Sequence, residues 1–193
     1  MGHKFNPERM SILLAPERRS LLDPAHVLEL LPIAEDQTVA DVGCGPGYFS
    51  IPLGHHLTTG RLYAFDVQEE MVRAAAKNVK EAGLTNVEVQ LSSEHSIPTA
   101  TSSLDGVFFA FALHEVEGPL PTFVAMLRDR LRPGGWLAVL DWKKEEMEEG
   151  PPLHERLTED EVRDIGEASG MTFTSAIPLN PKQYLVLFGR PVG

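Results

Sequence analysis

Three alternating glycines directly after a short apolar run are the feature of this sequence that most clearly points to chemistry. Gly43, Gly45 and Gly47 follow a run, residues 39–42, that is typical of a strand and contains Asp41. Glycines at this spacing let the backbone adopt positive φ and approach a ligand with no Cβ atom in between. A strand that leads through such a turn into a helix is the arrangement by which many α/β folds bind nucleotides. We therefore predict a ligand-binding turn here.

The charge at this turn favours a cationic ligand. Pro46 removes one backbone N–H from a loop that would need its donors to hold a pyrophosphate. Asp41 adds a negative charge where a dinucleotide would bring its own. We expect Asp41 to face a positively charged group of the ligand, directly or through water.

A second carboxylate, Asp66, follows the next predicted strand. It lies 25 residues after Asp41. A carboxylate at this point can accept hydrogen bonds from both hydroxyls of a ribose, each worth roughly 1.5–3 kcal/mol. The alternative is that Asp66 only caps the helix that follows, because Asp is a common N-cap residue.

Strands and helices alternate along the chain. Hydrophobic periodicity predicts strands at residues 38–42, 61–65, 87–91, 104–111, 136–140, 172–177 and 184–188, and helices at 24–31, 48–57, 68–82, 119–131 and 159–169. Alternation over residues 38–140 predicts an α/β, doubly wound parallel sheet with right-handed crossovers. Such sheets bind ligands at the carboxyl ends of their strands, where the glycine turn and Asp66 would meet.

Two further groups of polar residues follow strands four and five. His114 comes just after the fourth strand, where an imidazole could act as a general base or only shape the pocket. Trp142 and Lys143 follow the fifth strand, where they could wall a substrate pocket and hold an anion or simply begin a solvated charged run. Residues 143–156 are rich in Glu around a Gly-Pro-Pro centre, so we predict a mobile segment that becomes ordered when ligands bind.

Length, charge and cysteine content limit the function. The 193 residues fit one domain over residues 1–193 with one core. A net charge of −11 disfavours nucleic acid and anionic membranes as partners, while a homo-oligomer stays open. The single cysteine, Cys44, excludes an intramolecular disulfide and a multi-thiolate metal site, and we expect no metal and a cytoplasmic protein.

The pattern Asp-x-Gly-x-Gly-x-Gly at residues 41–47 resembles the first motif of class I S-adenosylmethionine-dependent methyltransferases. Their cofactor carries an ammonium and a sulfonium and no phosphate. The resemblance extends over about residues 23–190 and includes Asp66, Ile97-Pro98, the segment 103–107 and the turn 132–135. It is closest to the small enzymes that act on quinone precursors, arsenic or other small molecules. It implies a Rossmann-like, seven-stranded sheet, mostly parallel with an antiparallel C-terminal strand and helices on both faces.

The resemblance also implies roles for individual residues. The cofactor S-adenosylmethionine would be bound by Asp41, Gly43, Cys44, Gly45, Gly47, Asp66, Val67, Met71, Ser93, Glu94, Ala110 and His114. Asp66 would hold the ribose, and Val67 and Met71 would pack on the adenine. Ser93 stands where relatives carry an Asp that contacts the adenine amino group, with Glu94 as a substitute. Phe5, Phe111, Trp142 and Lys143 would contact the acceptor, His114 would be the catalytic residue, and residues 1–35 would cap the site.

The sequence therefore indicates a methyltransferase that acts on a small, partly apolar molecule. An arsenite acceptor is not expected, because the enzymes that methylate arsenite bind it through several thiolates. A non-catalytic module that binds S-adenosylmethionine or S-adenosylhomocysteine, and more distantly an NAD-dependent oxidoreductase, are the alternatives.

Overall fold

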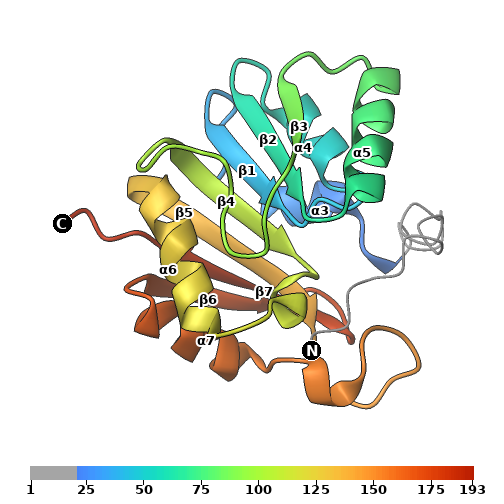
Figure 1. Ribbon diagram of the computed structural model, residues 1–193. Coiled ribbons are helices and arrows are strands. Elements are labelled where there is room, and N and C mark those ends of the chain that lie inside the picture. Colours follow the sequence, from blue (N-terminus) through green and yellow to red (C-terminus); the bar gives the residue numbers. More distant parts are fainter. Residues whose placement is uncertain (1–20) are drawn as a thin grey trace.

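One mixed β-sheet organises residues 21–193, the part of the chain that the computed structural model describes (Figure 1). Its seven strands, counted over those residues, lie in the order β3-β2-β1-β4-β5-β7-β6. Neighbours from β3 to β5 pair in parallel, and β7 is antiparallel to both β5 and β6. The strands are β1 (Thr38–Val42), β2 (Arg61–Asp66), β3 (Val87–Leu91), β4 (Leu104–Ala110), β5 (Leu131–Trp142), β6 (Thr172–Pro178) and β7 (Gln183–Gly189). The predicted fold class is confirmed.

Helices cover both faces of this sheet. They are α3 (Pro24–Glu29), α4 (Ser50–His56), α5 (Glu69–Glu81), α6 (Leu120–Arg130) and α7 (Glu159–Ala168), with the short 3₁₀ turns η2 (Leu113–Glu115) and η3 (Leu153–Glu155). Val39 packs in one apolar cluster with residues of α3 and α4, whereas the next residue, Ala40, packs in another with α6 and α7. Phe108 and Phe109 of β4 divide between the same two clusters, and both are buried. A strand buried on both faces explains the continuous apolar run in β4.

The helix boundaries follow capping rules that the sequence shows. Asp23 accepts a hydrogen bond from Ala25 N at the start of α3, with Pro24 at the first helical position. Thr158 and Glu161 form both bonds of a capping box at α7. The helices therefore begin where the sequence predicts.

The start of β5 differs from the prediction. The sequence predicts a turn at residues 132–135 and a strand from Trp136, but β5 begins at Leu131, which pairs with Leu104. The pairing then shifts, so that Gly106 lies opposite Trp136. Arg190 explains the difference, because its backbone exchanges hydrogen bonds with Gly134 and Gly135 and holds the turn against the end of β7.

We predict that Gly106→Ala destabilises the fold. A Cβ atom on Gly106 would lie 2.1 Å from Cε2 of Trp136, whose indole is buried and donates to Gln37 Oε1. Overpacking of this kind costs about 1–3 kcal/mol, which urea unfolding would measure. Gly189→Ala is the matched control, because a Cβ there meets no described atom within 4 Å. Equal losses in the two variants would contradict the packing argument.

Candidate functional site

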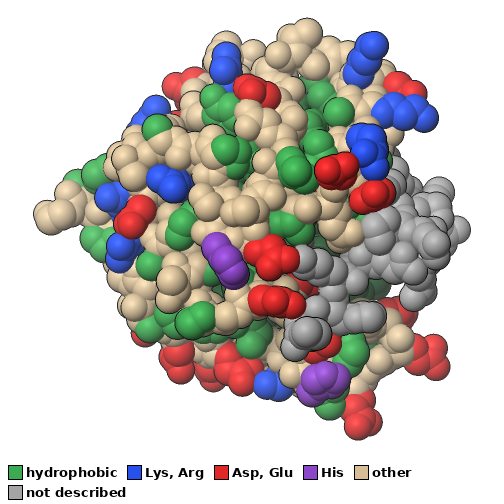
Figure 2. All heavy atoms as spheres, in the orientation of Figure 1, with side chains coloured by type: hydrophobic (Ala, Val, Ile, Leu, Met, Phe, Trp, Pro, Cys, Tyr) green, Lys and Arg blue, Asp and Glu red, His purple; other side chains and the backbone are tan. Residues whose placement is uncertain are grey.

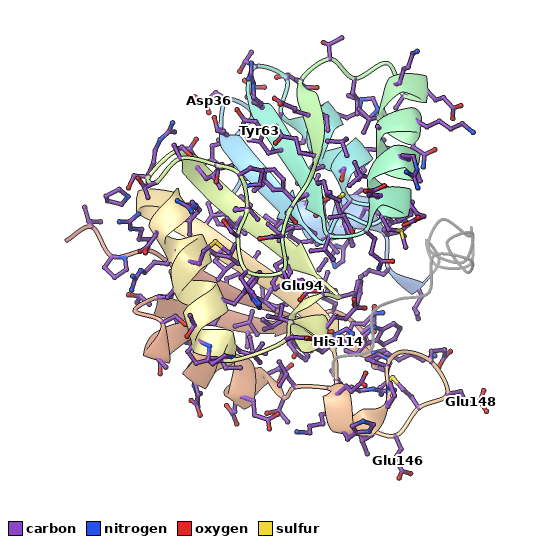
Figure 3. All side chains as sticks on the ribbon, viewed as in Figure 1. Asp36, Tyr63, Glu94, His114, Glu146 and Glu148 are labelled. Carbon is purple, nitrogen blue, oxygen red and sulfur yellow. The ribbon has the colours of Figure 1, made fainter. Side chains whose placement is uncertain are left out.

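The predicted site residues come together at the carboxyl edge of the sheet. The strand order places the ends of β2, β1, β4 and β5 side by side. In Figure 3, His114 and Glu94 lie toward the end of the molecule opposite Asp36, which precedes β1. The loops after these four strands therefore surround one site.

The glycine turn is held by the end of β2. Gly43 N and Cys44 N both donate to Phe65 O, at 2.8 and 2.9 Å. The φ angles of Gly43, Gly45 and Gly47 are +71°, +53° and +95°, a region that residues with a Cβ atom rarely adopt. The prediction that this turn needs glycine for its conformation is confirmed.

Asp66 joins the glycine turn to the next helix. Its Oδ2 accepts from Gly45 N and its Oδ1 from Gln68 N, each at 2.9 Å. The N-cap residue of α5 is Gln68, and no side chain caps this helix, so Asp66 lies before the cap and is not the N-cap itself. Its carboxylate instead fixes both the glycine loop and the residue that begins the helix. Each carboxylate oxygen has a second lone pair, which leaves acceptors for the hydroxyls of a ligand. Burial raises the pKa of Asp66, and its backbone hydrogen bonds oppose that change.

Asp41 is turned toward α4. Its side chain is buried, and Ser50 Oγ, at the start of α4, donates to Oδ2 at 2.6 Å. Burial raises the pKa of Asp41 to about 7, although the Ser50 hydrogen bond lowers it; the charge of Asp66 raises it further. A positively charged ligand would stabilise the ionised carboxylate, which agrees with a cationic ligand. The direct or water-mediated contact stays a prediction.

Cys44 and Met71 are both buried. Burial raises the pKa of the Cys44 thiol, so the residue lines the loop as a small apolar group. Met71 lies on the buried stripe of α5. Its predicted contact with the adenine remains a prediction.

Other predicted cofactor residues lie around Asp66. Val67 is 38% exposed and leaves apolar surface beside the loop. Ser92 N donates to Asp66 O at 2.9 Å, which brings the segment with Ser93 and Glu94 to the same edge. The Ser93 hydroxyl donates to Ser96 O at 3.3 Å. The adenine contacts of Ser93 and Glu94 stay predictions.

Phe111 is a conformational outlier next to this site. Its φ is +57°, and its N–H donates to Leu140 O at 2.7 Å. An aromatic residue in this region is strained by about 1–3 kcal/mol. The turn places Ala112 against the glycine loop, since a Cβ on Gly43 would lie 2.7 Å from Ala112 Cβ. Strain of this kind at the end of β4 marks a functional position.

The same turn brings His114 onto Asp141 at the end of β5. His114 Nδ1 lies 2.9 Å from Asp141 Oδ1, and the two side chains are 5% and 2% exposed. Asp141 also accepts from Trp142 N, which orients the carboxylate. Burial lowers the pKa of His114, but the hydrogen bond and charge of Asp141, with additional charge from Glu115 and Glu155, outweigh that effect and raise it above 6.5.

A buried histidine oriented by a carboxylate is an acid–base group. The sequence singled out His114 and a second candidate segment, residues 141–144, that begins with Asp141, but it did not predict that His114 and Asp141 form a hydrogen bond. The signal was available, because both residues follow neighbouring strands at the same edge.

The predicted acceptor residues are only partly brought together. The rings of Phe111 and Trp142 lie 5.4 Å apart and form one aromatic wall. Lys144 pairs with Glu161 of α7, so it does not join Lys143 to form a pair that binds an anion. The anion-binding role of Lys143 stays a prediction, and Phe5 lies outside the described residues.

Residues 143–156, which are predicted to be mobile without ligands, are tied together by a residue that the sequence did not single out. Arg156 is 4% exposed and donates hydrogen bonds to four backbone carbonyls of the segment, and the mobility itself stays a prediction. Every residue carries a backbone carbonyl that can accept a hydrogen bond, so no sequence pattern predicts that a buried guanidinium will bind these particular ones.

Two kinds of feature are absent from residues 21–193. No group of three or more His, Cys, Asp or Glu side chains within that range is placed to hold a metal ion. No helix within it is long and apolar enough to cross a membrane.

Asp41→Asn should flatten the dependence of stability on pH. The folded protein keeps a proton on Asp41 up to pH about 7, whereas the unfolded chain loses it near 3.8. Stability therefore falls as pH rises through this window, by up to about 4 kcal/mol at 1.36 kcal/mol per unit. The neutral amide carries no such loss. Urea unfolding of the ligand-free protein at pH 5 and pH 8 measures the difference.

Ser50→Ala is the control for that measurement. It removes the hydrogen bond that lowers the pKa of Asp41, so the loss of stability with pH should become larger. The argument is wrong if wild type and Asp41→Asn lose stability equally between the two pH values.

Comparison with known proteins identifies the family. A family model described as a methyltransferase domain matches residues 39–135, half of the chain. A demethylmenaquinone methyltransferase of Listeria welshimeri is 31% identical over 118 residues, 59% of this chain and 48% of the relative. A tRNA U34 carboxymethyltransferase of Desulfotalea psychrophila is 32% identical over 116 residues, 55% of this chain and 33% of that protein. The chain thus spans about half or less of the length of these curated relatives.

The match to a solved structure covers nearly the whole chain. The crystal structure of a SAM-dependent methyltransferase from Aquifex aeolicus superposes with a TM-score of 0.92 at 38% identity, over 97% of this chain and 100% of that one. The predicted family and its cofactor, S-adenosylmethionine, are confirmed. The glycine turn tied to Asp66, the seven-stranded sheet and these matches together show that the chain belongs to the class I S-adenosylmethionine-dependent methyltransferases.

Proposed function

We propose that this protein transfers a methyl group from S-adenosylmethionine to a small, partly apolar acceptor, and that His114 removes a proton from the acceptor. The observation that carries the proposal is the 2.9 Å hydrogen bond between the buried side chains of His114 and Asp141. It lies at the edge of the sheet that also carries the glycine turn. A module that only bound the cofactor would have no need of this pair.

The residues present fit the cofactor. The positive φ angles of the glycine turn let its backbone approach a ligand closely, and Asp66 keeps acceptor capacity for ribose hydroxyls. The cofactor supplies an electrophilic methyl group on a sulfonium. The Asp66 carboxylate provides negative charge for a cationic ligand, and a positive charge nearby would favour the ionised form of Asp41 as well. NAD, which brings a pyrophosphate, suits this loop less well.

The chemistry of the pair follows from its geometry. With Nδ1–H donating to Asp141, the other ring nitrogen, Nε2, is left to accept a proton from the acceptor. The Asp141 carboxylate then stabilises the imidazolium that forms. A base positioned in this way contributes typically 10²–10⁴-fold, and alignment of the reactants can supply about 7–11 kcal/mol of the barrier. An O–H, an N–H or an acidic C–H would each be a suitable acceptor group.

The surroundings favour a small molecule over a nucleic acid. Phe111 and Trp142 form an aromatic wall beside the pair. Figure 2 shows acidic side chains over the lower part of this face, around α7 and the loop 143–156, and the chain carries a net charge of −11. Such a surface repels phosphates. Among the relatives, the name demethylmenaquinone methyltransferase supports a quinol acceptor, and tRNA U34 carboxymethyltransferase provides the alternative to be tested.

The setting of the enzyme is part of the same proposal. A single domain over residues 1–193, with residues 1–35 capping the site, agrees with one continuous sheet in the described part of the chain. A cytoplasmic location agrees with a single, buried cysteine.

The pair predicts a specific dependence of the rate on pH. His114→Asn should lower kcat by about 10²–10⁴-fold. In wild type the rate should rise with pH and level off above the raised pKa of His114, because only the neutral imidazole accepts a proton. Asp141→Asn removes the charge that raises this pKa, so the midpoint should move to lower pH and the plateau should fall.

Transfer of tritiated methyl groups to a panel of reduced demethylmenaquinone, simple phenols and total RNA measures these rates. Unchanged profiles in both variants would contradict the role as a base. Methylation of RNA, with none of the small molecules, would overturn the small-molecule assignment.

Asp66 provides the test of the cofactor site. Asp66→Ala should weaken binding of S-adenosylmethionine by two to four decades, because two charge-assisted bonds of roughly 1.5–3 kcal/mol are lost and the support of Gly45 is lost with them. Asp105→Ala is the matched control. Asp105 also accepts a backbone bond, from Thr38 N, but at the opposite end of the sheet. Titration calorimetry should give the control an unchanged Kd; an unchanged Kd for Asp66→Ala would sink the assignment.

A further inference from the structure

The loop after β5, residues 143–156, is built around one buried cation. Arg156 donates from Nε to Pro151 O at 2.7 Å, from Nη1 to Glu145 O at 2.6 Å and from Nη2 to Glu149 O at 2.8 Å. A longer bond of 3.4 Å reaches Lys143 O. The four carbonyls belong to residues that are spread along the loop from position 143 to position 151. The guanidinium therefore fixes the whole loop in one conformation, because a buried donor that loses its acceptor is costly.

The loop that Arg156 holds lies on Trp142. Gly150 has a φ of +87°, and a Cβ atom there would lie 2.8 Å from Cδ2 of the indole, so the loop backbone rests on the ring. The Trp142 ring also lies against Phe111, at 5.4 Å between ring centroids. A second support is the ion pair between Glu149 and Lys182. The position of Trp142 in the aromatic wall is thus determined by its contact with the loop 143–156.

The same loop carries a buried carboxylate. Glu155 lies in η3, directly before Arg156, and its Oε2 is buried and makes no hydrogen bond within the described residues. Its charge contributes to raising the pKa of His114. Glu146 and Glu148 lie at the outer end of the loop and point away from His114 (Figure 3).

We propose that Arg156 is a positioning residue of the acceptor site: its guanidinium holds the loop 143–156 so that Trp142 is in place beside Phe111 before any ligand binds. This inference rests on the proposed function, since it assigns the acceptor to that side of the site. It makes the loop a fixed wall. Four carbonyls at different points of the loop require a planar fork of donors, which Arg provides and Lys does not.

The first experiment measures the position of Trp142 without any reaction. In a Trp136→Phe background, Trp142 is the only tryptophan, and acrylamide quenching reports its exposure. Arg156→Lys should raise the quenching constant at least 2-fold. Lys144→Met is the control, because it breaks the exposed pair with Glu161 and leaves the carbonyl bonds intact. Unchanged quenching in Arg156→Lys overturns the proposal, whether or not a methyl acceptor has been found.

The second experiment separates positioning from folding. With whichever panel molecule wild type methylates, Arg156→Lys should raise the acceptor KM about 10-fold or more and leave the Kd for S-adenosylmethionine, measured by calorimetry, unchanged. Gly150→Ala, which moves the loop from the indole without changing Arg156, should raise the same KM. Parallel losses in cofactor Kd and acceptor KM would show a merely structural role and overturn the proposal.

Discussion

The Asp66 carboxylate is the point on which the cofactor side of this structure depends. The carboxylate accepts hydrogen bonds from Gly45 N, in the loop after β1, and from Gln68 N, at the start of α5. The backbone carbonyl of the same residue accepts from Ser92 N, in the loop after β3. Three loops are thereby fixed to the end of one strand. The parallel order of the strands makes this possible, because it brings the ends of β1, β2 and β3 to the same edge. One buried carboxylate then orders what would otherwise be independent loops.

This half of the site was predictable because its signals are local. The glycine turn, the apolar strand before it and the acid after the next strand are each visible within a short window, and Gly45 and Asp66 are only 21 residues apart. The left-handed φ angles explain why glycine stands there. The Asp66 side chain accepts from Gln68 N just before α5, and its hydrogen bonds to a ribose stay a prediction. The fold class was predictable for the same reason, since strand–helix alternation leaves few ways to connect parallel strands.

The acceptor half was less predictable because it depends on register. His114 and Asp141 meet only because Ala110 of β4 lies opposite Leu140 of β5. That register is reached after a shift in the pairing of β4 with the start of β5. The shift lies at residues 132–135, which the sequence predicts to be a turn outside the strand. The hydrophobic periodicity of a sequence identifies its strands, but it does not say which residues of two neighbouring strands lie opposite each other. The role of Arg156 was not predicted for a related reason. Its partners are backbone carbonyls, which every residue has, so the composition of the segment indicated only an acidic, solvated loop.

The two halves meet at Ala112. A Cβ atom on Gly43 would lie only 2.7 Å from the Cβ atom of Ala112. The turn at Phe111 therefore packs directly on the glycine loop. The acceptor wall is supported separately, by Arg156 within its own loop and by Lys182 from the segment before β7. Changes in residues 143–156 therefore alter the acceptor side with little effect on the glycine turn, whereas a larger residue at position 112 would disturb both. Under the proposed function, this geometry separates the cofactor side, around the glycine turn, from the acceptor side, around Trp142, and the strained segment between β4 and η2 links the two.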